Sequence, residues 1–208
     1  MKLYLVRHGQ SIGNVNKIHQ NADTPLSELG RSQATELAKR FKSIPIELIL
    51  TSHFTRAMCT AEIVSKKTGI SLEINELLRE LKMPCEVEGR STTDPEVADI
   101  KHQLIAHLDD KAWHLSDEEN AYDLMLRAAT ILSDVANRQE KSILVVSHGT
   151  LIRTIIGVVL FGDLFTPHLL QMLKSSLFLS NTGITRLEYI EDKWQISSVN
   201  DDAHLGNL

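Results

Sequence analysis

Two short apolar segments that each end in a His-Gly pair constrain the fold of this chain most strongly. Residues 2–6 are rich in strand formers and are followed by Arg7-His8-Gly9, and residues 142–147 are followed by His148-Gly149. Apolar side chains at helical spacing begin directly after Gly149. A buried strand that runs into a helix is typical of parallel α/β sheets, where ligands bind at the carboxyl ends of the strands. We therefore expect both histidines at that edge of a sheet.

The rest of the chain alternates between strand-like and helix-like segments. Strands are predicted at residues 2–6, 46–50, 71–75, 142–147, 184–190 and 194–199, and helices at residues 27–41, 54–67, 97–108 and 121–138 and after Gly149. This alternation predicts an α/β fold with a mostly parallel sheet. The turn at residues 191–193 predicts a C-terminal β-hairpin, which adds antiparallel pairing at one edge.

Residues 82–120 do not fit this alternation. The first part of the segment is polar and is interrupted by Pro84, Gly89 and Pro95. We predict that the chain forms one domain over residues 1–208, with residues 82–120 inserted between sheet elements as a cap or lid.

Composition excludes several classes of function. The chain has 208 residues and a formal net charge of −5, which argues against non-specific nucleic-acid binding. No apolar run approaches bilayer length, and the first residues become charged too soon for a signal peptide. Cys59 and Cys85 form neither a disulfide framework nor a zinc cluster. We expect a cytoplasmic protein without membrane or nucleic-acid partners.

Chemistry-bearing residues follow four of the predicted strands. Arg7 and His8 follow the first, Arg56 falls in the first turn of the helix after the second, Glu80 follows the third, and His148 follows the fourth. Two guanidinium groups suit the oxygens of a phosphate. Neutral His8 can attack phosphorus, protonated His148 can stabilise the developing charge, and Glu80 can protonate the leaving oxygen.

An alternative is that two histidines and a glutamate hold zinc. Neighbouring Arg7 and Arg56 would repel such a cation, so we predict neither a metal nor another cofactor.

The motif order resembles the histidine phosphatase superfamily, the phosphoglycerate-mutase-like proteins. Residues 5–14 (Leu-Val-Arg-His-Gly-Gln-Ser-Ile-Gly-Asn) are similar to its signature, and the likeness continues through residues 23–34, 51–61, 78–80 and 146–149. The resemblance implies a three-layer α/β/α fold with a six-stranded sheet whose fifth strand is antiparallel. It also implies that His8 is the phosphorylated nucleophile and Glu80 the proton donor.

The same resemblance implies a substrate-binding set around His8. Arg7, Arg56 and His148 form the phosphate pocket, and Asn14 matches a further position of that pocket. Asn14 also suits an ordinary loop turn. Gln20 lies in the same loop, Gly149 allows close approach of backbone to ligand, and Asn181 is a weaker candidate. A small phosphorylated metabolite is the expected partner, and a homo-oligomer is possible.

Departures from the family pattern bear on the substrate. His53-Phe54 replaces the usual Pro-Leu pair, and we expect His53 to face solvent. Residues 81–86 replace the His-Tyr-Gly stretch of the mutase branch, and the chain is shorter than typical mutases. Both differences favour a phosphatase that hydrolyses a small phosphomonoester. A phosphoglycerate mutase and a non-catalytic module that binds phospho-ligands or phosphoproteins remain as alternatives.

Overall fold

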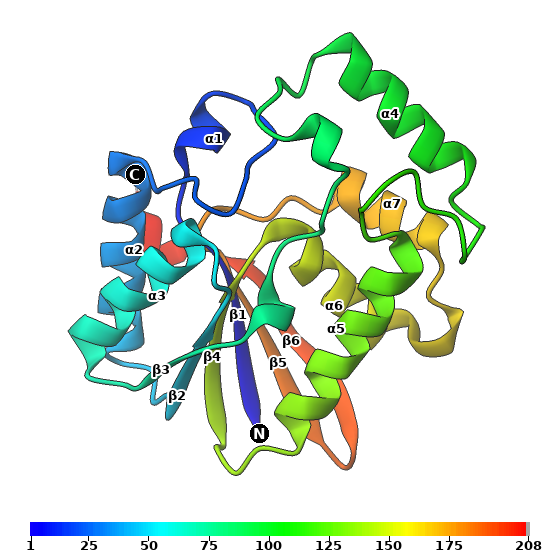
Figure 1. Ribbon diagram of the computed structural model, residues 1–208. Helices are drawn as coiled ribbons and strands as arrows, with labels where there is room; N and C mark the ends of the chain where they lie inside the picture. The colour runs from blue at the N-terminus through cyan, green and yellow to red at the C-terminus, as the bar shows by residue number, and fades with distance from the viewer. Residues whose placement is uncertain (207–208) are drawn as a thin grey trace.

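A computed structural model, which describes residues 1–206, shows a six-stranded sheet between two layers of helices (Figure 1). The strand order is β3-β2-β4-β1-β5-β6. The strands are β1 (Lys2–Arg7), β2 (Leu48–Thr51), β3 (Leu72–Ile74), β4 (Ser142–Ser147), β5 (Ile184–Ile190) and β6 (Lys193–Asp201). The first four are mutually parallel, and β5 runs antiparallel to both β1 and β6. The predicted α/β fold and its antiparallel fifth strand are confirmed.

Helices cover both faces of the sheet, which explains why β1 and β4 are continuous apolar runs. On one face lie α2 (Glu28–Phe41) and α3 (Thr55–Thr68), and on the other α5 (Ala121–Ala136), α6 (Gly149–Phe161) and α7 (Pro167–Ser176). Side chains along β1 alternate between the two cores: Leu3 and Leu5 join the second layer, whereas Tyr4 and Val6 join the first.

Local signals set most helix boundaries. The Ser27 hydroxyl accepts the Gly30 N–H and starts α2, and Gly69 ends α3 with a positive φ of 78°. Gly30 also packs so tightly that a Cβ there would collide with the carbonyl oxygen of Gln10. Predicted boundaries shift by one or two residues at several elements, most visibly for β2. Helix α7 was not predicted, although Thr166-Pro167 is a typical helix start.

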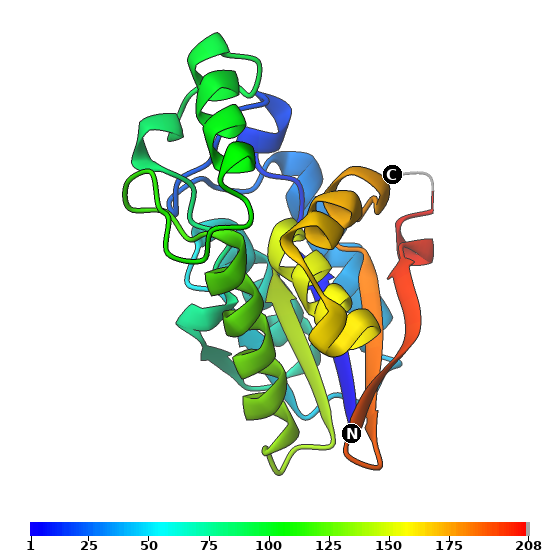
Figure 2. The same cartoon turned by 90° about the vertical axis from the view of Figure 1, so that its right-hand side faces the viewer.

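Residues 82–120 lie above the carboxyl ends of the strands, as Figure 2 shows. They contain the short helix η2 (Cys85–Val87) and helix α4 (Pro95–Ala106). A bridge between Ile18 and Ser91 joins them to the loop that follows α1 (Ile12–Val15). The remaining short helices are η1 (Glu76–Leu78), η3 (Gly162–Leu164) and η4 (Ala203–Leu205).

Within residues 1–206, none of the helices has both the length and the apolar character needed to cross a membrane.

Candidate active site

The two His-Gly segments meet because β1 and β4 are neighbours in the sheet. Arg7 pairs in register with Ser147, so that His8 and His148 leave adjacent strand ends. The His8 N–H donates to the carbonyl of Ser147, and the two imidazole rings lie 5.2 Å apart between centroids. Both histidines are buried. The sequence expectation that these residues share one edge is therefore met in the structure.

The hydrogen bonds of His8 define which ring nitrogen carries the proton. Nδ1 lies 2.7 Å from the carbonyl oxygen of Gly9, which can only accept, and Nε2 lies 3.2 Å from Nε of Arg56, which can only donate. Nδ1 is therefore protonated and Nε2 holds a lone pair. Burial, together with the charges of Arg56 and Arg7, holds the pKa of His8 well below its usual value. A neutral imidazole with a free Nε2 is the form that can act as a nucleophile.

Three arginines line the cavity together with His8. Burial lowers the pKa of Arg56 to about 10, so its guanidinium stays charged at neutral pH. Arg7 donates from Nη1 to the carbonyl of Leu179 at 2.7 Å, while its buried Nε has no partner in residues 1–206. Arg153, which the sequence analysis did not select, lines the same cavity and donates to Leu177. Unpartnered guanidinium N–H groups beside a nucleophile suit an anionic ligand.

His148 is fully buried next to His8 and does not line the cavity. Its Nε2 is 3.0 Å from the hydroxyl of Ser52, and its Nδ1 is buried without a partner among the described residues. Burial, the neighbouring His8 ring and the charges of Arg56 and Arg7 hold the pKa of His148 well below its usual value. The predicted protonated form therefore requires a nearby anion that offsets these cations.

Glu80 reaches the site from the segment after η1. Its carboxylate oxygens accept N–H groups of Thr150 (3.1 Å) and Leu151 (3.2 Å) in the first turn of α6, and of Leu81 (2.9 Å). A helix N-terminus is a favourable place for a carboxylate. Glu80 lies at the predicted edge of the sheet, but its hydrogen bonds to the first turn of α6 were not predicted.

Arg127 of α5 fixes the backbone around Glu80, and the sequence analysis missed it. Its guanidinium donates to the carbonyls of Leu77, Arg79 and Glu80 and forms two hydrogen bonds to Glu119. Burial acts to raise the pKa of Glu119, but hydrogen bonding and charge from Arg127 outweigh it and lower that pKa. An arginine within the apolar stripe of residues 124–131 was the signal that could have identified this buried contact.

The side chains enclose a cavity of about 510 Å³. Most of the predicted site residues line it: Arg7, His8, Asn14, Gln20, Arg56, Glu80 and Gly149. Asn14 has both proposed features, because it lines the cavity while its Oδ1 accepts from Ser11. Asn181 lies outside the lining and instead donates to the carbonyl of His8 at 2.9 Å.

The His53-Phe54 departure has a clear structural outcome. His53 is exposed, as predicted, whereas Phe54 lines the cavity. The rings of Phe54 and His148 pack in a T-shaped arrangement with their centroids 5.2 Å apart. The centroid of the Phe54 ring lies 5.0 Å from the guanidinium carbon of Arg56. Phe54 therefore packs against two of the predicted site residues, the His148 ring and the Arg56 guanidinium.

The geometry does not favour the zinc alternative. In the part of the chain that the structure describes, one group of three His, Cys, Asp or Glu residues has ligand atoms within 4.8 Å of one another. It consists of the exposed residues Cys85, Glu86 and Asp117. His8, Glu80 and His148 do not form such a group.

Comparisons with known proteins agree with this architecture. The family model of the histidine phosphatase superfamily (branch 1) matches residues 3–202. A probable phosphoglycerate mutase GpmB from Enterobacter sp. (strain 638) is 31% identical over 206 residues, covering 95% of this chain and 89% of that protein. The chain belongs to the histidine phosphatase superfamily.

Solved structures with the same fold include phosphatases. Bacillus stearothermophilus YhfR superimposes with a TM-score of 0.83 at 28% identity, covering 98% of both chains. A phosphoserine phosphatase from Entamoeba histolytica, solved in complex with 3-phosphoglyceric acid, has a TM-score of 0.79 at 27% identity over 98% of both chains. The named relatives thus include a probable mutase and a phosphatase.

Proposed function

We propose that this protein is a phosphatase that hydrolyses a small phosphomonoester through a phosphohistidine on His8. The observation that carries the proposal is the tautomer of His8, whose unprotonated Nε2 lies beside a charged guanidinium in a buried cationic pocket. Such an arrangement binds a phosphoryl group next to a nucleophile. The phosphatase relatives support the same reaction class.

In the first step, Nε2 of His8 attacks phosphorus and the bond from phosphorus to the ester oxygen breaks. The carboxyl group of Glu80 gives its proton to that oxygen, and the alcohol leaves. Arg7, Arg56 and His148 stabilise the negative charge of the transferring group. Asn14, Gln20 and the backbone at Gly149 contribute further contacts to the substrate.

In the second step, water attacks phosphorus and the bond from phosphorus to Nε2 breaks. The Glu80 carboxylate accepts the proton of the water, so inorganic phosphate leaves and both residues return to their starting forms. Residues 82–120 act as a cap over the cavity, since Lys82 to Cys85 form part of its wall. The positive charge of the arginines replaces a metal ion in this scheme.

Substitution of the nucleophile tests the covalent route. His8→Ala abolishes release of phosphate from p-nitrophenyl phosphate while the circular dichroism spectrum stays native, and the wild-type protein labelled with ³²P-substrate carries acid-labile phosphate. The exposed His53→Ala variant is the matched control and retains activity. Turnover in His8→Ala contradicts the covalent route, and a strong loss of activity in EDTA contradicts metal independence.

A phosphoglycerate mutase is the second candidate, because relatives about 30% identical carry that name. A mutase must shield its phosphohistidine from water and return the phosphoryl group to a substrate. The test supplies 3-phosphoglycerate with and without 2,3-bisphosphoglycerate. Rapid isomer exchange without phosphate release identifies a mutase, whereas steady phosphate release identifies a phosphatase.

A further inference from the structure

A second cavity of about 360 Å³ adjoins the catalytic one. His19, Glu80 and Leu81 line both, as do Met83 and Thr150. Glu80, the proposed proton donor, therefore lies at the boundary between the two cavities. Since Glu80 has to reach the leaving oxygen, the alcohol part of a substrate bound at His8 points toward this boundary.

The walls of the second cavity are mainly apolar, and most of their apolar side chains come from three helices and from the segment between α4 and α5. Leu104 and Ile105 belong to α4, Leu124 to α5 and Leu170 to α7, while Trp113 comes from the segment between α4 and α5. Ile105 remains 55% exposed. A small, fully polar alcohol would leave this apolar lining in water, so the cavity suits an aryl or alkyl group.

Two lysines add positive charge to the same cavity. Lys101 of α4 and Lys174 of α7 both line it, and neither ammonium group has an ion-pair partner within residues 1–206. Lys101 is half-buried and Lys174 is exposed, so a ligand in the cavity can reach both side chains.

The acidic residues of the lining do not neutralise these lysines by direct contact. Glu119 is bound to Arg127 and Arg79, and Glu118 accepts the backbone N–H groups of Leu115 and Ser116. His19, at the boundary, has a buried Nε2 without a partner in the described part of the chain. A ligand with an acidic group would complete the electrostatics of this cavity.

We propose that the second cavity binds the alcohol part of the substrate, and that this part is an aryl or alkyl group carrying a second acid that Lys101 and Lys174 recognise. The proposal rests on the proposed phosphatase function. The substrate is then a phosphomonoester with two anionic ends: the phosphate at His8 and the acid at the two lysines, separated by an apolar portion.

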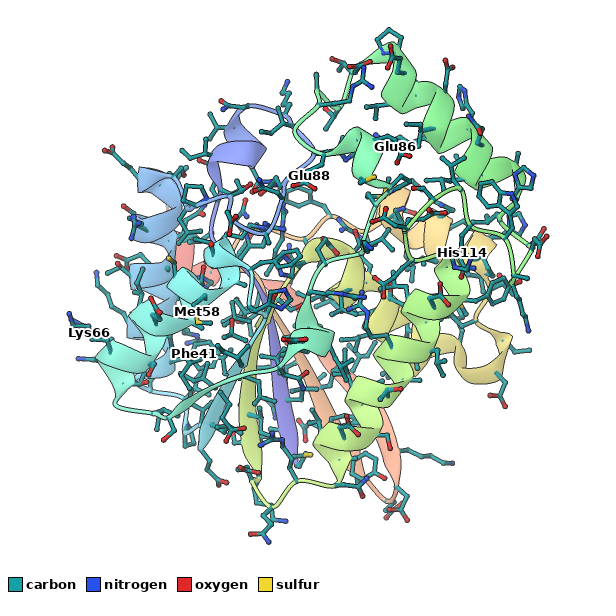
Figure 3. The ribbon with its side chains drawn as sticks, in the orientation of Figure 1. Phe41, Met58, Lys66, Glu86, Glu88 and His114 are labelled. Atoms are coloured by element: carbon teal, nitrogen blue, oxygen red, sulfur yellow. The ribbon has the colours of Figure 1, made fainter. Side chains whose placement is uncertain are left out.

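Three synthetic esters test the proposal: phenyl phosphate, 3-(4-phosphonooxyphenyl)propanoate and the corresponding neutral propanamide. The carboxylate is expected to have at least about a tenfold higher kcat/KM than the amide, the effect of one well-formed charged contact. Lys101→Met and Lys174→Met each reduce this ratio toward one. Lys66→Met, on the far end of α3 (Figure 3), is the matched control and keeps the wild-type ratio.

A further variant tests the apolar wall. Leu104→Ala is expected to raise the KM for phenyl phosphate by about three- to tenfold. The inhibition constant of inorganic phosphate, a competitive inhibitor, should rise much less. Leu104 is half-buried, so the substitution does not open the main core.

The outcomes separate the two proposals. Equal use of the carboxylate and the amide, or a preference that survives in both lysine variants, overturns the second subsite while turnover of phenyl phosphate upholds the phosphatase. If the wild-type protein hydrolyses none of the three esters, the phosphatase proposal fails and the subsite fails with it.

Discussion

The pocket at the strand ends and the segment of residues 82–120 are built in opposite ways. In the pocket, His8, Arg56 and His148 are each no more than 3% exposed and extend from β1, α3 and the β4–α6 junction. In the segment, α4 buries only Val97, and the ion pairs of Arg90 with Asp94 and Glu96 are accessible to solvent. Such surface pairs stabilise little.

The difference in packing matches a difference in the proposed roles of the two regions. The groups that hold the phosphoryl group in the proposed mechanism lie on packed elements, whereas the residues proposed to recognise the rest of the substrate lie partly on a weakly packed segment. The two regions are joined at Arg127 and Glu119, which tie the backbone of Glu80 to α5. Four substitutions or conditions test this division.

The largest effect is expected in the pocket. Arg56→Ala removes the N–H that faces Nε2 of His8 and a positive charge from the phosphate site, so kcat/KM falls by about 10³-fold. Steady-state hydrolysis of p-nitrophenyl phosphate measures the loss. Arg31→Ala on the exposed face of α2 is the control and retains activity. A loss below tenfold would show that Arg56 does not contact the transferring group.

The junction between the regions gives the next largest effect. Arg127→Met leaves the mostly buried Glu119 carboxylate with one ion-pair partner, Arg79, and the backbone N–H of Lys82, which costs about 3 kcal/mol of unfolding free energy. Arg127→Met with Glu119→Gln recovers part of that loss, because the mostly buried negative charge of Glu119 is removed and the unpaired Arg79 is more exposed. Urea unfolding measures both.

Arg127 also positions Glu80, and kinetics distinguish this role from stability alone. If the Glu80 backbone shifts in Arg127→Met, esters with poor leaving groups slow more than p-nitrophenyl phosphate, whose leaving group needs no proton. Equal slowing of all esters would reduce Arg127 to a structural residue.

The fold was largely predictable from the sequence, whereas the packing around the site was not. The apolar runs before His8 and His148 predict two buried strands and their shared edge, because both depend on local pattern and general sheet rules. Arg127 binds backbone carbonyls 47 to 50 residues away, a contact that no local pattern encodes. Family resemblance supplied the roles of the individual site residues.

The second cavity shows the same limit. Lys101, Leu124 and Lys174 belong to three helices that are remote in sequence, and they share a wall only because α4, α5 and α7 pack around it. Helix α7 itself was not predicted. Met172 in the middle of α7 is 62% exposed, so one apolar side chain of this helix lies outside its buried face.

Acid should weaken the pocket moderately. His8 and His148 have folded-state pKa values below the ordinary 6.5, so the unfolded chain takes up their protons first as the pH falls. Above about pH 6.5 both histidines are neutral in the folded and the unfolded chain, so they leave the free energy of unfolding unchanged. Below that pH the free energy of unfolding falls, by at most about 1.4 kcal/mol per pH unit for each histidine.

Urea unfolding between about pH 7.5 and pH 5.5 measures this slope. The double variant His8→Gln, His148→Gln is expected to show a shallower fall than the wild type, and exposed His53→Gln the wild-type fall. Inorganic phosphate should reduce the wild-type slope, since a bound anion favours protonated His148. Identical slopes in the wild type and the double variant would contradict the burial of both histidines in neutral form.

The smallest effect is expected in the segment. Arg90 pairs with Asp94 at 3.0 Å and with Glu96 at 2.6 Å, and all three are within residues 82–120. Arg90→Ala should leave the urea midpoint of the whole protein unchanged, as should Arg40→Ala on α2, because exposed pairs stabilise little. Cleavage within residues 82–120 should nevertheless be faster in Arg90→Ala than in the wild type, because local opening there needs little free energy. Limited proteolysis measures this rate. A clear fall in the midpoint would show that residues 82–120 unfold together with the sheet. The proposed difference in packing between the pocket and this segment would then be wrong.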